Sequence, residues 1–227
     1  AVATFSDVDH PLTTEPVKTR ELLYKTTPQG ELNMHVFSPA GEMQAAVLRP
    51  CVVFFFGGGW KSGTYAQFVP QAEYLASRGI IAACADYRIA SIHKTLPDSA
   101  LEDAKSAIRW VRAHAVELGV DPDKVIAAGG SAGGHLAACT ALCPGFDAAT
   151  DDKTISAKPN ALVLFNPAMN IATLFKERAS AQSPISLEMA EAITPNSFVS
   201  KDTPPAILFF GSADALKVGG DEYVQKA

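Results

Sequence analysis

A chain of 227 residues is long enough to bury an apolar core without disulfide staples. Its residues are 48% hydrophobic and 19% charged, with a formal net charge of −5. This mild acidity disfavours a nucleic-acid-binding surface, which needs clustered Lys and Arg, and no apolar run approaches the ~20 residues of a membrane span.

Apolar runs typical of strands alternate along the chain with amphipathic runs typical of helices. The first two strands, joined by TPQG at 27–30, predict an antiparallel hairpin, and DPD at 121–123 predicts a turn before the fifth strand. The predicted strands cover 19–25, 32–37, 51–56, 80–85, 124–128, 162–165 and 206–210. The predicted helices cover 66–78, 97–115, 136–142, 171–178 and 185–193, and a further helix begins within 218–227.

This alternation predicts an α/β fold with a mostly parallel sheet, an antiparallel hairpin at its start and helices on both faces. Chemistry in such sheets gathers at the carboxyl ends of the strands. The irregular insert at 167–205 is placed to form a cap over that edge. Because the sequence shows no repeat or linker, we expect residues 1–227 to form one domain.

The four cysteines predict buried thiols rather than a metal site. Cys51 and Cys84 lie in apolar runs, and Cys139 and Cys143 share one face of a predicted helix. No C-x-x-C pair is present, so reduced, buried thiols are the expectation, although a Cys51–Cys84 disulfide stays open if their strands are neighbours. Nothing in the sequence calls for a metal, nucleotide or flavin cofactor.

The most informative stretch is GGSAG at 129–133, a G-x-S-x-G pattern between a predicted strand and a predicted helix. Such a turn lifts the hydroxyl of Ser131 clear of the sheet, above the free N–H groups of a helix N-terminus. The alternatives are a plain capping serine and a phosphate-binding loop. No Lys-Ser/Thr follows and G-x-G-x-x-G is not matched, so we predict that Ser131 is a nucleophile.

A second glycine motif, GGG at 57–59, follows the third predicted strand directly. A serine that attacks an ester forms a tetrahedral oxyanion, which needs preorganised N–H donors. Glycines turn backbone amides into a site without side chains in the way. We predict that Gly58, Gly59 and the amide of Ala132, just after Ser131, form this oxyanion hole.

With these two motifs the chain resembles the α/β-hydrolase superfamily, and within it esterases related to hormone-sensitive lipase and small bacterial acetyl and feruloyl esterases. The resemblance runs from about residue 19 to the end and includes ADYRIA at 85–90, LPDSALEDAKSAIRWVRAHA at 96–115 and DPDKVIAAGGSAGGHLA at 121–137. One departure is Phe56, where many of these esterases carry a structural histidine. The pair Gly59-Trp60 at the end of the glycine motif resembles the corresponding pair in the acetyl and feruloyl esterases.

The resemblance implies a catalytic triad in the order Ser, Asp, His. Asp214, just after the last predicted strand, matches the acid, which would hold the histidine in its tautomer and stabilise the imidazolium. Its alternative role is a local bond in a loop turn. Asp202 lies before that strand, at its wrong end.

No histidine follows Asp214 in the sequence. His135, one helical turn beyond Ser131, is the only rival as a base, and the resemblance implies a packing role for it. The remaining histidines lie in the N-terminal tail (His10), in the hairpin (His35), before the long helix (His93) and on that helix (His114). We expect the native chain to continue for roughly 30 to 50 residues with a strand and a histidine-bearing loop.

The leading interpretation is therefore a serine carboxylesterase acting on small-molecule esters with short acyl groups, including acetyl or feruloyl esters of carbohydrates. Trp60 and Tyr65 could line the substrate pocket or could be packing residues. An amidase or peptidase of the same fold is one alternative, and a non-catalytic α/β-hydrolase used for binding is another. The chain begins with Ala1 and not Met, so we expect a trimmed start, which leaves secreted, periplasmic and cytoplasmic locations open.

Overall fold

The computed structural model describes residues 16–40, 48–178 and 185–227. Within these residues the strands are β1 (Val17–Thr27), β2 (Gly30–Pro39), β3 (Arg49–Phe55), β4 (Ile81–Ala85), β5 (Val120–Gly130), β6 (Ala161–Phe165) and β7 (Ala206–Phe209). The α-helices are α1 (Val69–Ala76), α2 (Ala90–His93), α3 (Pro97–Ala113), α4 (Ala115–Leu118), α5 (Ala132–Leu142), α6 (Ile171–Arg178), α7 (Leu187–Ala192) and α8 (Lys217–Lys226). Two 3-10 turns complete the elements, η1 (Tyr65–Phe68) and η2 (Pro195–Ser197).

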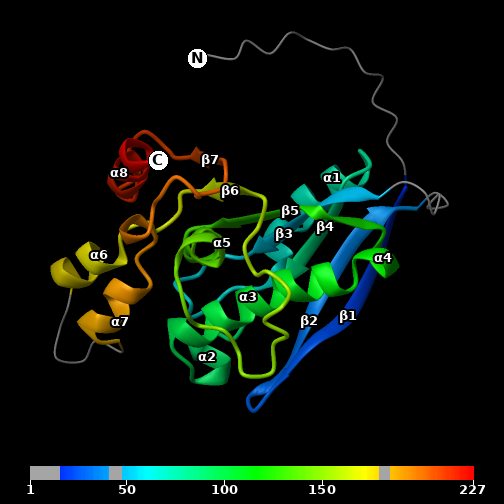
Figure 1. The fold of residues 1–227 in the computed structure, drawn as a ribbon, viewed down its shortest axis with the longest axis horizontal. Helices are drawn as coiled ribbons and strands as arrows, with labels where there is room; N and C mark the ends of the chain where they lie inside the picture. Colours follow the sequence, from blue (N-terminus) through cyan, green and yellow to red (C-terminus); the bar gives the residue numbers. More distant parts are fainter. Residues whose placement is uncertain (1–15, 41–47, 179–184) are drawn as a thin grey trace, which may run out of the picture.

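The strands form a single sheet in the order β1-β2-β4-β3-β5-β6-β7, with the hairpin at one end and β7 at the other (Figure 1). β2 pairs antiparallel with β1 and β4, and every pair from β4 to β7 is parallel. The mostly parallel sheet with an antiparallel hairpin at its start is therefore confirmed. β5, β6 and β7 are aligned so that Gly130, Phe165 and Phe209 lie side by side at their carboxyl ends.

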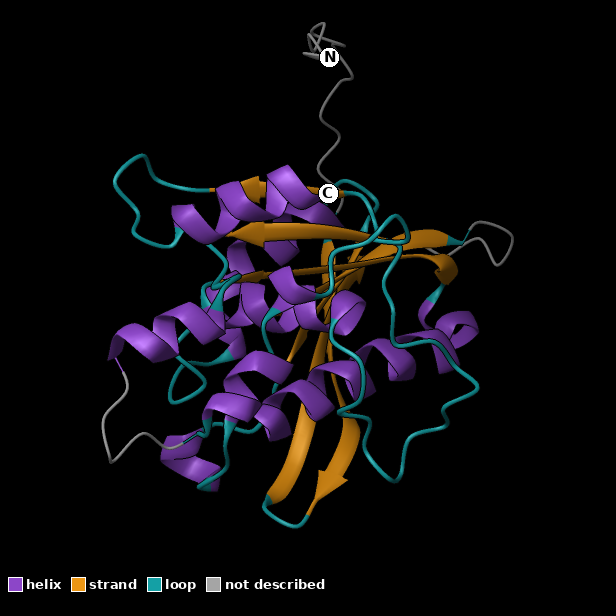
Figure 2. Cartoon of the chain, turned by 60° about the vertical axis from the view of Figure 1, so that its left-hand side comes forward, coloured by secondary structure: helices purple, strands orange, loops and turns teal. Residues whose placement is uncertain are grey.

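Helices pack on both faces of the sheet because successive residues of β3 point to opposite sides. Val53 and Phe55 join the core cluster that includes residues of α3 and α5. Val52 and Phe54 join a second cluster, which includes residues of α1. Figure 2 shows the strands in the middle of the molecule with helices around them, and the predicted layering is confirmed.

Three predicted boundaries were wrong. The turn at 121–123 lies inside β5, where the pairing with β3 shifts register between Arg49 and Cys51; the long strand absorbs it as an irregularity at Pro122, which has no N–H for the ladder. The helix α5 begins at Ala132, four residues before its predicted start, because two glycines made its first turn look non-helical. The predicted helix at 66–78 divides into η1 and α1.

All four cysteines are buried and free, as expected for reduced core thiols. β3 and β4 are neighbours, but Cys51 pairs with Ile81 and Cys84 with Phe54. Cys51 and Cys84 also belong to clusters on opposite faces of the sheet, so they form no disulfide. In the described ranges of the chain, no helix combines the length and apolarity that crossing a membrane would take.

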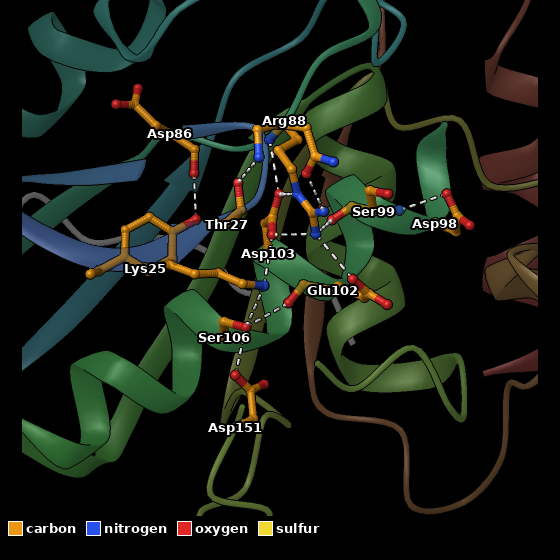
Figure 3. Close-up of polar contacts among 12 residues, drawn as sticks. Lys25, Thr27, Asp86, Arg88, Asp98, Ser99, Glu102, Asp103, Ser106 and Asp151 are labelled. Atoms are coloured by element: carbon orange, nitrogen blue, oxygen red, sulfur yellow. Dashed lines mark hydrogen bonds and ion pairs between the residues drawn. The ribbon is translucent and has the colours of Figure 1, made fainter. Parts of the chain in front are cut away.

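A buried carboxylate fastens the hairpin to the helix α3. Asp103 is 0% exposed and accepts Lys25 Nζ from β1 at 2.7 Å and Arg88 Nε, just after β4, at 2.8 Å. The backbone N–H of Arg88 also donates to Asp103, at 2.9 Å. Figure 3 shows Asp103 between the two cations. Because three separate segments depend on one charge, this network fixes how the edge of the sheet sits on α3.

We predict that Asp103→Asn lowers the free energy of unfolding by about 3–5 kcal/mol, because it leaves the buried Lys25 without its counter-charge and Arg88 with only the more exposed Glu102. Urea unfolding followed by circular dichroism measures this. Asp221→Asn is the matched control, since Asp221 is 58% exposed and, among the residues that the structure describes, pairs only with Lys217 on the surface of α8. An Asp103→Asn midpoint equal to that of the control would contradict the prediction.

Candidate active site

Ser131 sits in a strained turn between β5 and α5. Its φ is 52° and its ψ −115°, a backbone conformation that residues other than glycine rarely adopt. Its N–H donates to the Phe165 carbonyl on β6 at 2.9 Å, and its carbonyl accepts the His135 N–H at 2.9 Å. Strain of this kind persists only where the surroundings enforce it, and it clusters at functional sites.

The glycines on either side of Ser131 are required because the backbones of β3, β5 and α5 pass very close to one another there. A Cβ on Gly133 would lie 2.0 Å from the Phe55 carbonyl oxygen, and one on Gly129 would lie 2.5 Å from Gly133. Real Cβ contacts are never this short, so no other residue fits either position without moving β3 or α5. The spacing of the motif is thus set by β3, β5 and α5 meeting at one point.

The glycine loop (residues 57–63) continues from β3 to lie beside Ser131. A Cβ on Gly57 would be only 3.4 Å from the Ser131 Cβ. Gly58 has a φ of 133°, and a Cβ there would lie 2.0 Å from the Ser62 carbonyl oxygen. The two motifs, more than seventy residues apart in sequence, are therefore brought together, as predicted.

Free amides gather where the glycine loop meets the start of α5. Within the described ranges, no residue accepts a hydrogen bond from the N–H of Gly58, Gly59 or Ala132. Gly58 instead uses its carbonyl, which accepts from the amides of Lys61 and Ser62 at 3.1 Å each. Donors left free at a helix start next to a strained serine are chemically suited to receive an oxyanion.

Two contacts that the sequence did not predict hold the glycine loop. Gln67 Oε1 accepts the Gly57 N–H at 2.5 Å, and the Tyr87 hydroxyl donates to the Phe56 carbonyl at 2.7 Å. Tyr87 belongs to the ADYRIA stretch, which carried family resemblance but no assigned role. Gln67 lies in no motif, so only the folded structure reveals it.

An apolar cavity of about 360 Å³ opens beside the glycine loop. It is within the size range of small-molecule sites. Its walls come from the loop, from the start of α3 and from the insert, and include Gly59, Trp60, Leu96, Leu174, Phe175 and Ile185. The cavity begins one residue from the Gly58 amide, so a substrate whose carbonyl meets the free amides can place one of its groups here.

Tyr65 lies elsewhere. Its ring stacks on His35 of β2 with centroids 3.4 Å apart, and it lines a separate cavity with Asp86 and Glu21. Trp60 and Tyr65 thus face different cavities, and only Trp60 borders the one described above. The sequence paired them because they follow the same loop, but the chain turns between them.

Asp214 follows β7 at the same carboxyl edge of the sheet as Ser131. Its Oδ1 accepts the Leu216 N–H at 2.8 Å, and its N–H donates to the Gly211 carbonyl at 3.1 Å. This is the local turn bond of the alternative interpretation. The side chain is half-buried, and Oδ2 has no partner in the described part of the chain. One oxygen holds the turn and the other is free for an imidazole.

No ring of a described histidine hydrogen-bonds with Ser131 or Asp214. The ring nitrogens contact Asp86 (His35), Ile89 (His93), Trp110 (His114) and Ile193 (His135). His10 lies outside the described residues. Within residues 16–40, 48–178 and 185–227, every imidazole ring is thus bonded to a group other than Ser131 or Asp214.

His135, the rival base, is a packed residue. It is 0% exposed, and its Nε2 lies 2.7 Å from the Ile193 carbonyl oxygen. Burial lowers the pKa of His135 to about 4, and the bond to Ile193 opposes this shift only in part. The ring is thus neutral near pH 7 and its donor nitrogen is occupied.

Residues 34–218 match the BD-FAE family. The chain belongs to the BD-FAE family. Its sheet and helices are those of an α/β-hydrolase, and the strained serine and the glycine loop lie inside the matched range.

Relatives of this BD-FAE chain include ester hydrolases of Mycobacterium tuberculosis. The probable carboxylic ester hydrolase LipM is 35% identical over 175 residues, which cover 70% of this chain and 40% of LipM. The carboxylesterase NlhH is 38% identical over 93 residues, which cover 40% of this chain and 28% of NlhH. The BD-FAE chain thus spans less than half the length of these curated relatives.

Solved structures of an esterase cover more of the chain. Thermogutta terrifontis esterase 2 phosphonylated by cyclosarin matches with a TM-score of 0.81 and 40% identity, over 92% of this chain and 78% of that chain. Its propionate-bound form matches with a TM-score of 0.81 and 40% identity, over 92% and 79%. The relatives and the matched structures are thus ester hydrolases, and this chain shares their fold.

We expect Gly133→Ala to destabilise the protein by more than about 3 kcal/mol, because its Cβ would overlap the Phe55 carbonyl and force β3 from α5. Thermal unfolding measures the effect. Gly211→Ala is the control, since a Cβ there meets nothing within 4 Å. Equal melting temperatures for the two variants would show that the crossing is not tight.

The low pKa of His135 predicts a pH dependence of stability. Between its ordinary value of 6.5 and about 4, the unfolded chain binds a proton at residue 135 that the folded protein excludes. Stability therefore falls as pH falls through that window. His135→Gln should reduce the loss between pH 6.5 and 4.5 by about 2 kcal/mol, measured by urea unfolding at each pH. Parallel curves for variant and wild type would contradict this.

Proposed function

We propose that this protein is a serine carboxylesterase that hydrolyses short-chain acyl esters through an acyl-enzyme on Ser131. The observation that carries the proposal is the contact between the strained serine and the glycine loop, with a Gly57 Cβ position 3.4 Å from the Ser131 Cβ. It brings a hydroxyl and unused backbone amides to one place. The ester hydrolases among the relatives support the same chemistry.

In this mechanism Ser131 Oγ attacks the ester carbonyl carbon while its proton passes to a base. The carbonyl oxygen becomes an oxyanion and accepts from the amides of Gly58, Gly59 and Ala132. Collapse of the intermediate expels the alcohol, which takes the proton from the base. A water molecule then attacks the acyl-serine in the same way, releasing the acid and restoring the hydroxyl.

We propose that the base is a histidine outside the described residues, oriented by Asp214. Asp214 Oδ2 is without a partner in the described part of the chain, which leaves an acceptor for an imidazole N–H. β7, the strand before it, pairs on one side with β6 and leaves Ile207 49% and Phe209 46% exposed. An apolar sheet edge of this kind suits a further segment that would bring the histidine to Asp214.

We propose that substrates are small esters with short acyl groups, acetyl or feruloyl esters of carbohydrates among them. The cavity of about 360 Å³ beside Gly59 can hold one such group, and Thermogutta terrifontis esterase 2 has been solved with propionate and with butyrate. The insert, through Leu174, Phe175 and Ile185, forms one wall of the cavity and would act as the cap. A non-catalytic binding role is the second candidate, favoured because the ring of every described histidine is bonded to a group other than Ser131.

We predict that Ser131→Ala lowers kcat on p-nitrophenyl acetate and butyrate by more than about 10⁴-fold, because it removes the nucleophile. The full-length protein should also be labelled stoichiometrically by a fluorophosphonate, and Ser131→Ala should not. Mass spectrometry and initial rates give both readouts.

Ser77→Ala is the matched control, since Ser77 is partly exposed and its hydroxyl bonds only to the Tyr74 carbonyl within the described chain. Full-length wild-type protein that is folded but neither hydrolyses the esters nor takes the label would instead support the binding role. Turnover unchanged in Ser131→Ala would refute the nucleophile.

A further inference from the structure

His135 contacts three parts of the candidate site, one through its backbone and two through its buried ring, although the ring is not placed for proton transfer. It lies in the first turns of α5, and its backbone N–H donates to the Ser131 carbonyl at 2.9 Å. Its Nε2 lies 2.7 Å from the Ile193 carbonyl oxygen, so Nε2 carries the hydrogen in the neutral ring. The same nitrogen is 3.2 Å from Cys139 Sγ, one turn further along α5.

Ile193 begins a bridge segment (residues 193–196) that connects α5, through a chain of hydrogen bonds, to the turn that carries Asp214. Asn196 Nδ2 donates to the Gly219 carbonyl on α8 at 2.9 Å. Gly219 in turn donates to the Leu216 carbonyl, and Leu216 donates to Asp214 Oδ1. The bridge segment is also held to α6, because the Thr194 hydroxyl accepts the Ala172 N–H at 2.9 Å.

The third contact is with the glycine loop. The rings of Trp60 and His135 meet edge to face, with centroids 5.0 Å apart and planes at 83°. Trp60 directly follows Gly59 and has a φ of 56°, so its ring position and the direction of the neighbouring amides are tied together. His135 is therefore packed between the loop that offers the amides and the segment that leads to Asp214.

We propose that His135 is a positioning residue for the esterase reaction. It fixes α5, and with it Ser131, against both the glycine loop and the bridge segment. This inference rests on the proposed function, because positioning Ser131 matters for catalysis only if Ser131 is the nucleophile. Losing the Nε2–H donor would leave the buried Ile193 carbonyl with only the weak thiol donor of Cys139, 3.6 Å away, so the bridge segment would shift. Displacements of about 1 Å among reacting groups lower rates about 100-fold while ground-state binding changes little.

Replacing His135 by Gln or by Asn separates the role of the donor nitrogen Nε2 from that of the ring, because the two amide side chains differ in length. In His135→Gln the side-chain amide reaches to the position of Nε2 and can still donate to Ile193. In His135→Asn it ends at the position of Nδ1 and cannot. In the full-length protein, with p-nitrophenyl butyrate, we expect His135→Gln to keep kcat within about threefold of wild type, and His135→Asn to lose more than about tenfold with KM changed less than about twofold.

Fluorophosphonate labelling gives a second readout, because its rate depends on the reactivity of Ser131 and on the oxyanion donors. The labelling rate should fall in His135→Asn by the same factor as kcat. His114→Gln is the matched control, because His114 lies at the end of α3, where its Nδ1 is 2.9 Å from the Trp110 carbonyl oxygen and its ring stacks on Trp110; within the described residues its side chain has no hydrogen bond to the site. It should match wild type in both rates.

Asn196→Ala decides the question if His135→Asn does not fold. It cuts the bridge segment from Gly219 and should likewise lower kcat with KM nearly constant. A folded His135→Asn or Asn196→Ala with wild-type kcat and labelling rate would overturn the positioning role, as would a His135→Gln no more active than His135→Asn. Ser131→Ala, measured alongside, separates the outcomes: if its turnover is unchanged, the proposed function itself fails.

Discussion

The candidate site depends on one contact between backbones, the crossing of β3 and the first turn of α5. The Phe55 carbonyl oxygen would lie 2.0 Å from a Cβ at position 133, so only glycine admits the approach. With α5 this close, the chain between β5 and α5 has room for one residue, and Ser131 takes a φ of 52°. The strain at the serine is the local consequence of tight packing between two elements.

The same contact decides where the amides lie. β3 ends at Phe55, so the chain that leaves it must pass beside the turn at Ser131 before it can run on to η1. Glycines at 57–59 make that passage, and the loop is then pinned by Gln67 and Tyr87. Far from this point, the Asp103 network holds the hairpin to α3. The edge of the sheet can therefore be fixed by charge while the site is fixed by sterics.

The glycine motifs could be read from the sequence because a close crossing of backbones leaves glycines in a short, recognisable pattern. The features that the sequence missed or left open are set by distant partners that leave no such pattern. The turn at 121–123 was absorbed into β5 by its pairing with β3. Tyr65, for which the sequence left a pocket role and a packing role open, stacks on His35, a residue from the hairpin. The bonds of Gln67 to Gly57 and of His135 to Ile193 join segments that no short pattern relates.

Two tasks that an imidazole can perform in this site make opposite demands on its surroundings. A residue that holds α5 in place must be packed on all sides, and such burial lowers the pKa of His135 to about 4. A base that accepts the serine proton and returns it to the alcohol needs a pKa near the working pH and a free nitrogen facing the hydroxyl. One ring cannot meet both demands, so a site that uses His135 for position requires a second imidazole for proton transfer. We have proposed that this second ring pairs with Asp214, whose side chain is only partly buried, and weaker desolvation of this kind keeps the pKa of an imidazole closer to its ordinary value.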